Sequence, residues 1–239
     1  MSFRDTRLFF IRHGHTAANS GALMSGWTDF PLSPLGRRQA EALSRRFLGE
    51  PPVSALYTSP LQRASDTARA LTGLRIPPGD FHPLDDLREV GCGEVDGWPV
   101  SRVLKQYPGL WEANLRQDDP GFRWPGGESY QEFRERCLAA VRRIAAAHPG
   151  ERVAVVTHAG VICTVVGWLH GTSPAEWRRF RPGNCSLTEV SWSRRCGTVI
   201  RFDDRSHLVG LNSEEETEGP REEISAALGP GANTCPPGG

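Results

Sequence analysis

Five consecutive residues near the amino terminus have side chains suited to binding an oxyanion. They are Arg12, His13, Gly14, His15 and Thr16. A tetrahedral phosphate needs planar bidentate donors, close approach of the main chain and further hydroxyl or amide donors. This segment supplies a guanidinium, an imidazole, a residue without a side chain and a hydroxyl, so we expect it to form a phosphate-binding loop.

A second histidine follows a distant apolar run in the same way as His13 follows the first. Residues 8–11 are all apolar and precede Arg12 and His13, and residues 153–156 are all apolar and precede Thr157 and His158. We interpret both runs as buried strands. Because the carboxyl ends of parallel strands face one crevice, we expect the imidazoles of His13 and His158 to meet there.

A further guanidinium is expected beside this crevice. Ser59 and Pro60 are typical of a helix start, with serine as the cap and proline at the first helical position. Arg63 would then lie in the first turn, next to a helix amino terminus that itself favours anions.

Strands and helices alternate along the chain. The hydrophobic periodicity and the capping residues predict strands over 7–12, 53–58 and 152–157, a helix from Ser33 and Pro34 to about 47, and the helix opened by Ser59 and Pro60. Further helices are expected after the capping box of Ser129 and Glu132 and over 161–169, short ones near 100–107 and 110–115, and a strand pair over 185–192 and 198–202. This order predicts a three-layer α/β/α sandwich with a mainly parallel central sheet.

Composition limits the classes of protein and of partner. Residues 1–212 are expected to form one catalytic domain, and the Glu-, Gly- and Pro-rich residues 213–239 a disordered tail. The 28 Lys and Arg balance the 28 Asp and Glu, and no basic run with interleaved aromatics indicates nucleic acid. No apolar run approaches the roughly 18 to 20 residues of a membrane span, and no signal peptide is evident, so we expect a cytoplasmic protein without membrane partners. The six cysteines lack the spacing of zinc ligands, so we expect reduced, mostly buried thiols and no metal site.

The segment from Arg12 to Asn19 resembles the RHGxTxxN signature of the histidine phosphatase superfamily. That superfamily includes phosphoglycerate mutases and the phosphatase half of the fructose-2,6-bisphosphate enzymes. The likeness runs from about Leu8 to Leu211, and its order and spacing make it specific. Further matches are Leu35, Gly36, Gln39, Ser59, Pro60, Arg63, Leu87, Arg88, Glu89, Gly97, Gly127, Glu128, Thr157, His158 and Gly160.

The resemblance implies a phosphoglycerate mutase-like fold and a mechanism that uses no cofactor. It implies that His13 is the nucleophile that forms a phosphohistidine, with Arg12, Arg63 and His158 around the phosphoryl oxygens. It also implies that Glu89 is the general acid and base, with Asp85, Asp86 and Glu94 as nearby competitors. The phosphate- and substrate-binding set is then Arg12, Thr16, Asn19, Ser25, Gly26, Arg63, His158 and Ala159.

The expected activity is hydrolysis of a small phosphorylated metabolite. Mutases of the family carry a long insertion before the Gly-Glu pair and an aromatic residue shortly after the acid. Here Glu89 is followed by Val90, Gly91, Cys92 and Gly93, and Gly127 and Glu128 follow soon, which favours a phosphatase. A phosphoglycerate mutase-type phosphotransferase and a non-catalytic sensor of a phosphorylated ligand are the alternatives. Family analogy favours a homodimer.

Three positions depart from the family pattern. His15 replaces a frequent Glu or Gln, and we expect its side chain to point at solvent. Ala159 stands where many phosphatases of the family have Gly, and Cys163 where many have Arg. The substrate contacts of the family are therefore least applicable to this chain on the side of the pocket near Ala159 and Cys163.

Overall fold

A six-stranded sheet in the order β3-β2-β4-β1-β5-β6 forms the centre of the protein in the computed structural model, which describes residues 5–74, 76–77, 79–193 and 196–211. The strands are β1 (Thr6–Arg12), β2 (Ala55–Thr58), β3 (Phe81–Pro83), β4 (Arg152–Thr157), β5 (Leu187–Trp192) and β6 (Gly197–Asp204). Strands β3, β2, β4 and β1 are parallel, and β5 and β6 are antiparallel. The predicted mainly parallel sheet is confirmed. The tail expected over 213–239 lies outside the described residues.

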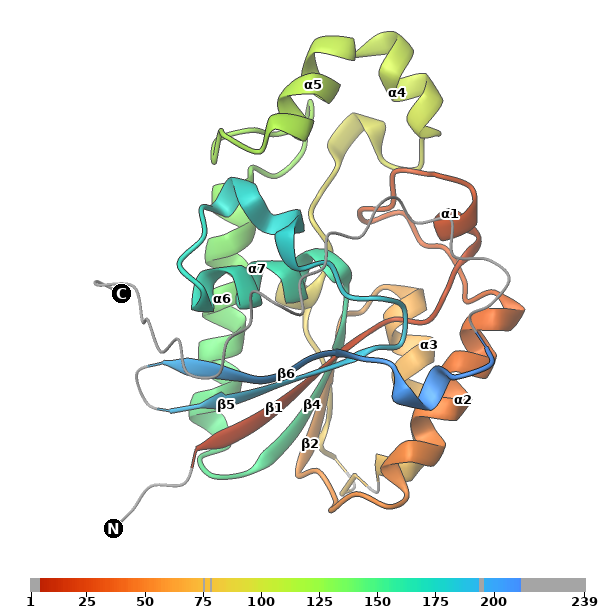
Figure 1. The fold of residues 1–239 in the computed structure, drawn as a ribbon, viewed down its shortest axis with the longest axis vertical. Coiled ribbons are helices and arrows are strands. Elements are labelled where there is room, and N and C mark those ends of the chain that lie inside the picture. Colours follow the sequence, from red (N-terminus) through yellow and green to blue (C-terminus); the bar gives the residue numbers. More distant parts are fainter. Residues whose placement is uncertain (1–4, 75, 78, 194–195, 212–239) are drawn as a thin grey trace.

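Alternate residues of β1 pack on opposite faces of the sheet. Leu8 and Phe10 belong to a core shared with helices α6 (Tyr130–Ala147) and α7 (Ala159–Leu169). Phe9 and Ile11 belong to a second core with α2 (Pro34–Phe47) and α3 (Gln62–Ala70). Figure 1 shows these helix pairs on the two sides of the sheet. Residues 8–11 of the strand are all apolar, as expected for a strand with both faces buried, and the predicted three-layer sandwich is confirmed.

The register of the two central strands brings the two histidines to one level. Strands β1 and β4 are hydrogen-bonded neighbours, and Arg12 is opposite Thr157. His13 and His158 are the residues that follow these two, so both leave the sheet at the same edge. This juxtaposition follows from the backbone alone.

Most helix starts agree with the sequence signals, and one does not. Ser129 and Glu132 form the predicted capping box of α6, and the Ser33 hydroxyl caps α2 by accepting from the main chain. Helix α3, however, begins at Gln62 rather than at Pro60. Its first main-chain nitrogen, that of Gln62, donates to Asp29 Oδ1 at 2.7 Å. The predicted cap at Ser59 is wrong, because the N-cap residue is Leu61. The Ser59 hydroxyl accepts from Leu61 N at 3.3 Å, ahead of the helix, and lies beside His158.

The stretch between α3 and α6 carries the predicted short helices α4 (Val100–Gln106) and α5 (Pro108–Arg116). They form the top of the molecule as drawn in Figure 1. The stretch is tied to the loop after β1, because Met24 N donates to Trp98 O and Gly97 N donates to Met24 O, both at 2.8 Å. The sequence did not indicate β3, α1 (Ala17–Ser20) or the 3-10 helices η1 (Thr72–Leu74), η2 (Asp85–Leu87), η3 (Gly93–Val95), η4 (Pro174–Phe180) and η5 (Ser206–Leu208).

Among the cysteines that the structure describes, one differs from expectation. Four of them, namely Cys92, Cys137, Cys163 and Cys185, are buried free thiols. Cys196 is disulfide-bonded, so the prediction of reduced cysteines is wrong there. In the described part of the chain, no helix combines the length and the apolar character needed to cross a bilayer.

Candidate active site

His13 lies directly after β1, and both its main-chain N–H and its carbonyl are hydrogen-bonded. Its main-chain nitrogen donates to Thr157 O at 2.9 Å, and its carbonyl accepts from Asn184 Nδ2 at 3.1 Å. The ring nitrogen Nδ1 lies 2.8 Å from Gly14 O. Because a carbonyl can only accept, Nδ1 carries the proton and Nε2 carries the lone pair. The imidazole is thus held with Nε2 as its nucleophilic atom.

His158 meets His13 as predicted from the strand ends. The two ring centroids lie 5.2 Å apart, and the planes are inclined by 59°. Nε2 of His158 lies 2.8 Å from Ser59 Oγ. Its Nδ1 is buried and forms no hydrogen bond within the described residues. The Ser59 contact therefore orients the ring and leaves Nδ1 for a ligand.

Two buried guanidiniums complete the cluster. Arg12 is 2% exposed, and its Nη1 donates to Pro182 O at 2.7 Å. Arg63 is 1% exposed, and it donates to the carbonyls of Gly26 at 2.7 Å and Thr28 at 3.0 Å. Carbonyls fix the position of a guanidinium without neutralising its charge. The site therefore keeps a positive potential suited to an oxyanion.

This potential acts on both imidazoles. Burial, followed by the charges of Arg63 and Arg12, holds the pKa of His13 well below its usual 6.5. Burial, Arg63 and His13 hold the pKa of His158 well below the same value. A neutral imidazole is the form that can attack a phosphorus atom, so the surroundings keep His13 in its reactive state.

The loop after His13 depends on two glycines in contact. A Cβ on Gly14 would lie 2.6 Å from Gly36 O, so only glycine fits there. Gly14 N donates to Thr67 Oγ1, and His15 N donates to Gln39 Oε1. The His15 side chain is 6% exposed, and its ring nitrogens contact the hydroxyls of two serines, Ser33 and Ser20. The expectation that His15 points at solvent is wrong, because these hydroxyls fix its ring inside the loop.

Thr16 and Asn19 contact each other at the start of α1. Asn19 Oδ1 accepts from Thr16 N at 2.9 Å and from Thr16 Oγ1 at 3.0 Å. It also accepts from Asn184 Nδ2 at 3.4 Å. The Thr16 hydroxyl therefore shapes the loop. The Asn19 oxygen is occupied, so its amide nitrogen is the group that remains to donate to a ligand.

Ser25 and Gly26 contribute their carbonyls to the positioning of Arg63. Arg63 Nη2 donates to both, at 3.4 Å and 2.7 Å. Asp96 in turn holds this loop, because its carboxylate accepts from the main-chain nitrogens of Gly26, Trp27 and Thr28 at 2.9, 2.6 and 3.0 Å. Asp96 thus positions Arg63 indirectly, through the loop whose carbonyls accept from it. The sequence analysis did not identify this role.

Glu89 lies against the amino terminus of α7, directly beyond His158. Its Oε2 accepts from Gly160 N at 3.0 Å, and its Oε1 accepts from Val90 N at 2.9 Å. A helix amino terminus stabilises a carboxylate. Ala159, the predicted substrate contact, is the first residue of this helix and is 7% exposed. The structure therefore places the Glu89 carboxylate at Gly160, two residues along the chain from His158.

The competitors of Glu89 are held elsewhere. Asp86 pairs with the exposed side chain of Arg143, and Asp85 pairs with the half-buried side chain of Arg88. Glu94 accepts from the Tyr107 hydroxyl at 3.3 Å. Of the four acids, Glu89 is the one that bonds to the segment that begins at His158.

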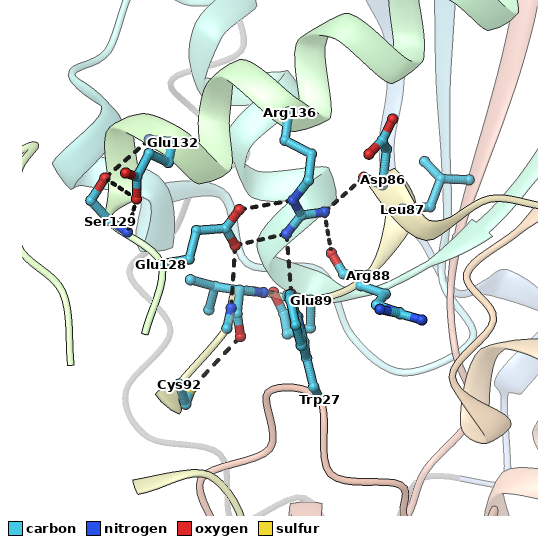
Figure 2. Close-up of polar contacts among 12 residues, drawn as sticks. Trp27, Asp86, Leu87, Arg88, Glu89, Cys92, Glu128, Ser129, Glu132 and Arg136 are labelled. Carbon is cyan, nitrogen blue, oxygen red and sulfur yellow. Dashed lines mark hydrogen bonds and ion pairs between the residues drawn. The ribbon is translucent and has the colours of Figure 1, made fainter. Parts of the chain in front are cut away.

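Arg136, on α6, holds the loop that carries Glu89. It forms a bidentate pair with Glu128, with both N–O distances 2.8 Å. It also donates to the carbonyls of Asp86 at 2.8 Å, Arg88 at 3.1 Å and Glu89 at 3.3 Å, as Figure 2 shows. Glu128 adds a second tie, because Gly91 N donates to its Oε2 at 3.2 Å. Sequence reasoning noted Glu128 but missed Arg136, which gives no local signal.

Two other contributors lie in the loop before β5. Asn184 bonds His13 and Asn19, and Cys185 N donates to Arg12 O at 3.1 Å. Cys185 has a φ of 53°, in the left-handed region. Gly183 and Asn184 are typical turn residues, but the sequence does not indicate that this turn contacts His13, 171 positions away. Cys163 faces the core, where its Sγ contacts Phe180 O at 3.0 Å.

Comparisons with known proteins show the family of this chain. The sequence model of the histidine phosphatase superfamily (branch 1) matches residues 8–205. The metal-independent phosphoserine phosphatase of Arabidopsis thaliana is 32% identical over 210 residues, which are 86% of this chain and 84% of that protein. The probable phosphoglycerate mutase GpmB of Cronobacter sakazakii is 30% identical over 210 residues, 84% of this chain and 94% of that protein. The solved structure of YhfR from Bacillus stearothermophilus superposes with a TM-score of 0.77 at 31% identity, covering 85% of this chain and 99% of that chain.

Proposed function

Because the chain belongs to the histidine phosphatase superfamily (branch 1), we propose that it hydrolyses a small phosphomonoester through a phosphohistidine on His13, without a metal ion. The observation that carries this proposal is the contact between His13 Nδ1 and Gly14 O at 2.8 Å, because it leaves Nε2 as the nucleophile. We assign the activity to residues 1–212.

In the first step, Nε2 of His13 attacks phosphorus, an N–P bond forms and the bond to the ester oxygen breaks. The negative charge spread over the phosphoryl oxygens is stabilised by the guanidiniums of Arg12 and Arg63. His158 donates through Nδ1, which has no other partner in the described segments, and Asn19 adds a neutral donor. These fixed charges take the part that a metal ion plays in other phosphatases.

Glu89 acts as the general acid in the first step and as the general base in the second. It gives a proton to the departing oxygen and takes one from the water that then attacks the phosphohistidine. Its hydrogen bonds to Gly160 N and Val90 N fix the carboxylate next to the segment that carries His158. Breakdown of the N–P bond releases phosphate and restores His13.

The test is phosphate release from a panel of phosphomonoesters in excess chelator. We expect turnover by the wild-type chain and none by His13→Ala. Phosphate release that requires priming with 2,3-bisphosphoglycerate would identify a mutase instead. Tight phosphate binding without turnover would identify a sensor.

A further inference from the structure

The loop before β5 supports two of the groups proposed for catalysis. The Pro182 carbonyl accepts from Arg12 Nη1 at 2.7 Å, and Cys185 N donates to Arg12 O at 3.1 Å. Asn184 Nδ2 donates to His13 O at 3.1 Å. The positions of Arg12 and His13 therefore depend on the main-chain path of this loop.

The loop has a backbone conformation that needs support from outside. Cys185 has a φ of 53°, in the left-handed region that residues other than glycine rarely adopt. Such a conformation persists only where the surrounding structure fixes it. We therefore looked for contacts to the main chain of the loop from other elements.

Two side chains from β6 and η5 hold the main chain of this loop. Asp203, in β6, accepts from Gly183 N through Oδ1 at 2.7 Å. His207, in η5, has its Nε2 at 3.0 Å from Cys185 O. Because a carbonyl can only accept, Nε2 of His207 carries the proton. A carboxylate and an imidazole thus bind the loop on either side of Asn184.

The imidazole of His207 is held in the state that can donate to the loop. Helix η5 lies against α2, as Figure 1 shows in blue and orange, and Arg46 Nη1, on α2, lies 3.4 Å from His207 Nδ1. A guanidinium can only donate, so Nδ1 carries the lone pair. Arg46 is fixed in turn by Asp204 Oδ2 at 2.7 Å and Ser206 Oγ at 3.0 Å. Burial lowers the pKa of His207, which agrees with a neutral ring.

The carboxylate of Asp203 is fixed as well. Its Oδ2 pairs with Arg205 Nε at 3.2 Å. Arg205 covers Gly183, because a Cβ added to that glycine would lie 2.8 Å from Arg205 Cδ. Asp203 has a φ of 50°, a left-handed conformation that aspartate and asparagine adopt more readily than most residues. A charged acceptor gives a main-chain N–H a stronger hydrogen bond than a neutral one, so Asp203 is well suited to hold the loop.

We propose that Asp203 and His207 are positioning residues, which hold the loop before β5 so that the guanidinium of Arg12 stays at the phosphoryl site. They act through the main chain of Gly183 and Cys185 and not on the substrate itself. This inference rests on the proposed function for the phosphoryl site, and it adds two residues that lie far from the signature segment in the sequence.

The first test measures binding of inorganic phosphate by calorimetry, which needs no turnover. His207→Ala should weaken phosphate binding by roughly 5- to 30-fold, the scale of one buried hydrogen-bond partner removed. His207→Gln should restore most of the affinity, because its amide nitrogen can donate where the imidazole Nε2 does. Wild-type affinity in His207→Ala, or an equal loss in His207→Gln, would overturn the role of His207.

His82→Ala is the matched control for this substitution. The His82 side chain is 39% exposed, and its Nε2 lies 3.8 Å from Asp80 Oδ1 on the other edge of the sheet. It should keep the wild-type affinity for phosphate. A loss in His82→Ala as large as that in His207→Ala would show a general effect of removing a histidine and would overturn the proposal.

Asp203 provides an independent pair of variants. Asp203→Gly removes the acceptor of Gly183 N without adding strain, since glycine adopts a φ of 50° freely. It should weaken phosphate binding, whereas Asp203→Asn should retain most of the affinity, because its amide oxygen can still accept from Gly183 N. Wild-type affinity in Asp203→Gly would overturn the role of Asp203.

A double-mutant cycle tests whether the effect passes through Arg12. Phosphate binding is measured by ³¹P NMR in Arg12→Met, where Arg63 still supplies a positive charge, and then in the same background with His207→Ala. Residues that act through one another do not have additive effects, so the added loss should be much smaller than in the wild-type chain. Equal losses in the two backgrounds would overturn the proposal.

These binding measurements separate the positioning role from the proposed function. They can give the expected result even if the wild-type chain releases no phosphate from any ester, which would contradict the proposed function alone. Turnover by the wild-type chain, with wild-type phosphate affinity in His207→Ala and Asp203→Gly, would overturn the positioning role alone.

Discussion

The carboxylate of Glu89 and the main chain of Gly160 are in direct contact. Glu89 Oε2 accepts from Gly160 N at 3.0 Å, and a Cβ added to Gly160 would lie 2.0 Å from Glu89 Oε1. The glycine is required by this close approach rather than by its backbone angles. The contact makes the position of the proposed acid and base depend on a residue that has no functional group.

Gly160→Ala should therefore lower kcat by displacing the Glu89 carboxylate. We expect a fall of roughly 10² to 10⁴, the range found for one acid or base group. Alanine favours a helix more than glycine does, so the melting temperature should change little. Gly109→Ala, on α5 with no atom within 4 Å of the added Cβ, should keep wild-type kcat. Full activity in Gly160→Ala would show that the position of Glu89 is not critical.

Arg136→Met should loosen the loop that carries Glu89. The side chain loses a bidentate pair with Glu128 and its bonds to three carbonyls. We expect the free energy of unfolding to fall by about 1 to 3 kcal/mol, as for other buried charged hydrogen bonds, and kcat to fall with it. Arg143→Met is the control, since Arg143 pairs with Asp86 but its side chain is 58% exposed. Equal denaturation midpoints for the two variants would contradict this role of Arg136.

Asp96→Ala should weaken phosphate binding through Arg63. Three main-chain donors of residues 26–28 lose their acceptor, and the carbonyl of Gly26 then no longer fixes the guanidinium. We expect a rise in the inhibition constant of inorganic phosphate together with a fall in kcat/KM. Asp118→Ala, an exposed residue paired with Arg116, serves as the reference. Unaltered phosphate inhibition in Asp96→Ala would show that the loop holds Arg63 without Asp96.

The lowered pKa values of the two histidines predict a pH response. An NMR titration of the His13 ring should show it neutral well below pH 6.5. Arg63→Met should raise this pKa, because it removes a nearby positive charge; an unshifted titration would contradict that cause.

Since the unfolded chain takes up protons at about pH 6.5 and the folded chain only at lower pH, these groups make the free energy of unfolding fall as pH drops below about 7. Above that pH they have no effect.

The sequence predicted the layers and the histidine pair because both depend on local patterns. Residues 8–11 and 153–156 are continuous apolar runs, and strands of this kind must be buried on both faces. Adjacent parallel pairing then fixes where His13 and His158 emerge. The start of α3 was predicted two residues too early, because the Ser59 hydroxyl contacts Leu61 N and His158 and caps no helical nitrogen.

The supporting residues could not be predicted, because each acts from a distant part of the chain. Arg136 reaches Glu89 from 47 positions away, and Asn184 reaches His13 from 171 positions away. His15 was expected at the surface because the sequence does not indicate that the loop turns its ring toward the hydroxyls of Ser20, five residues away, and Ser33. Such contacts depend on how the helices pack on the sheet and not on spacing along the chain.

The central claim is that Nε2 of His13 takes the phosphoryl group, and identification of the trapped intermediate tests it most directly. The chain would be mixed with a labelled phosphomonoester, quenched in alkali, in which phosphohistidine survives, and digested. Mass spectrometry should locate the label on the peptide that contains His13, and ³¹P NMR should show the Nε2 isomer. Label on His158, on the Nδ1 atom of His13 or on any other residue would contradict the account.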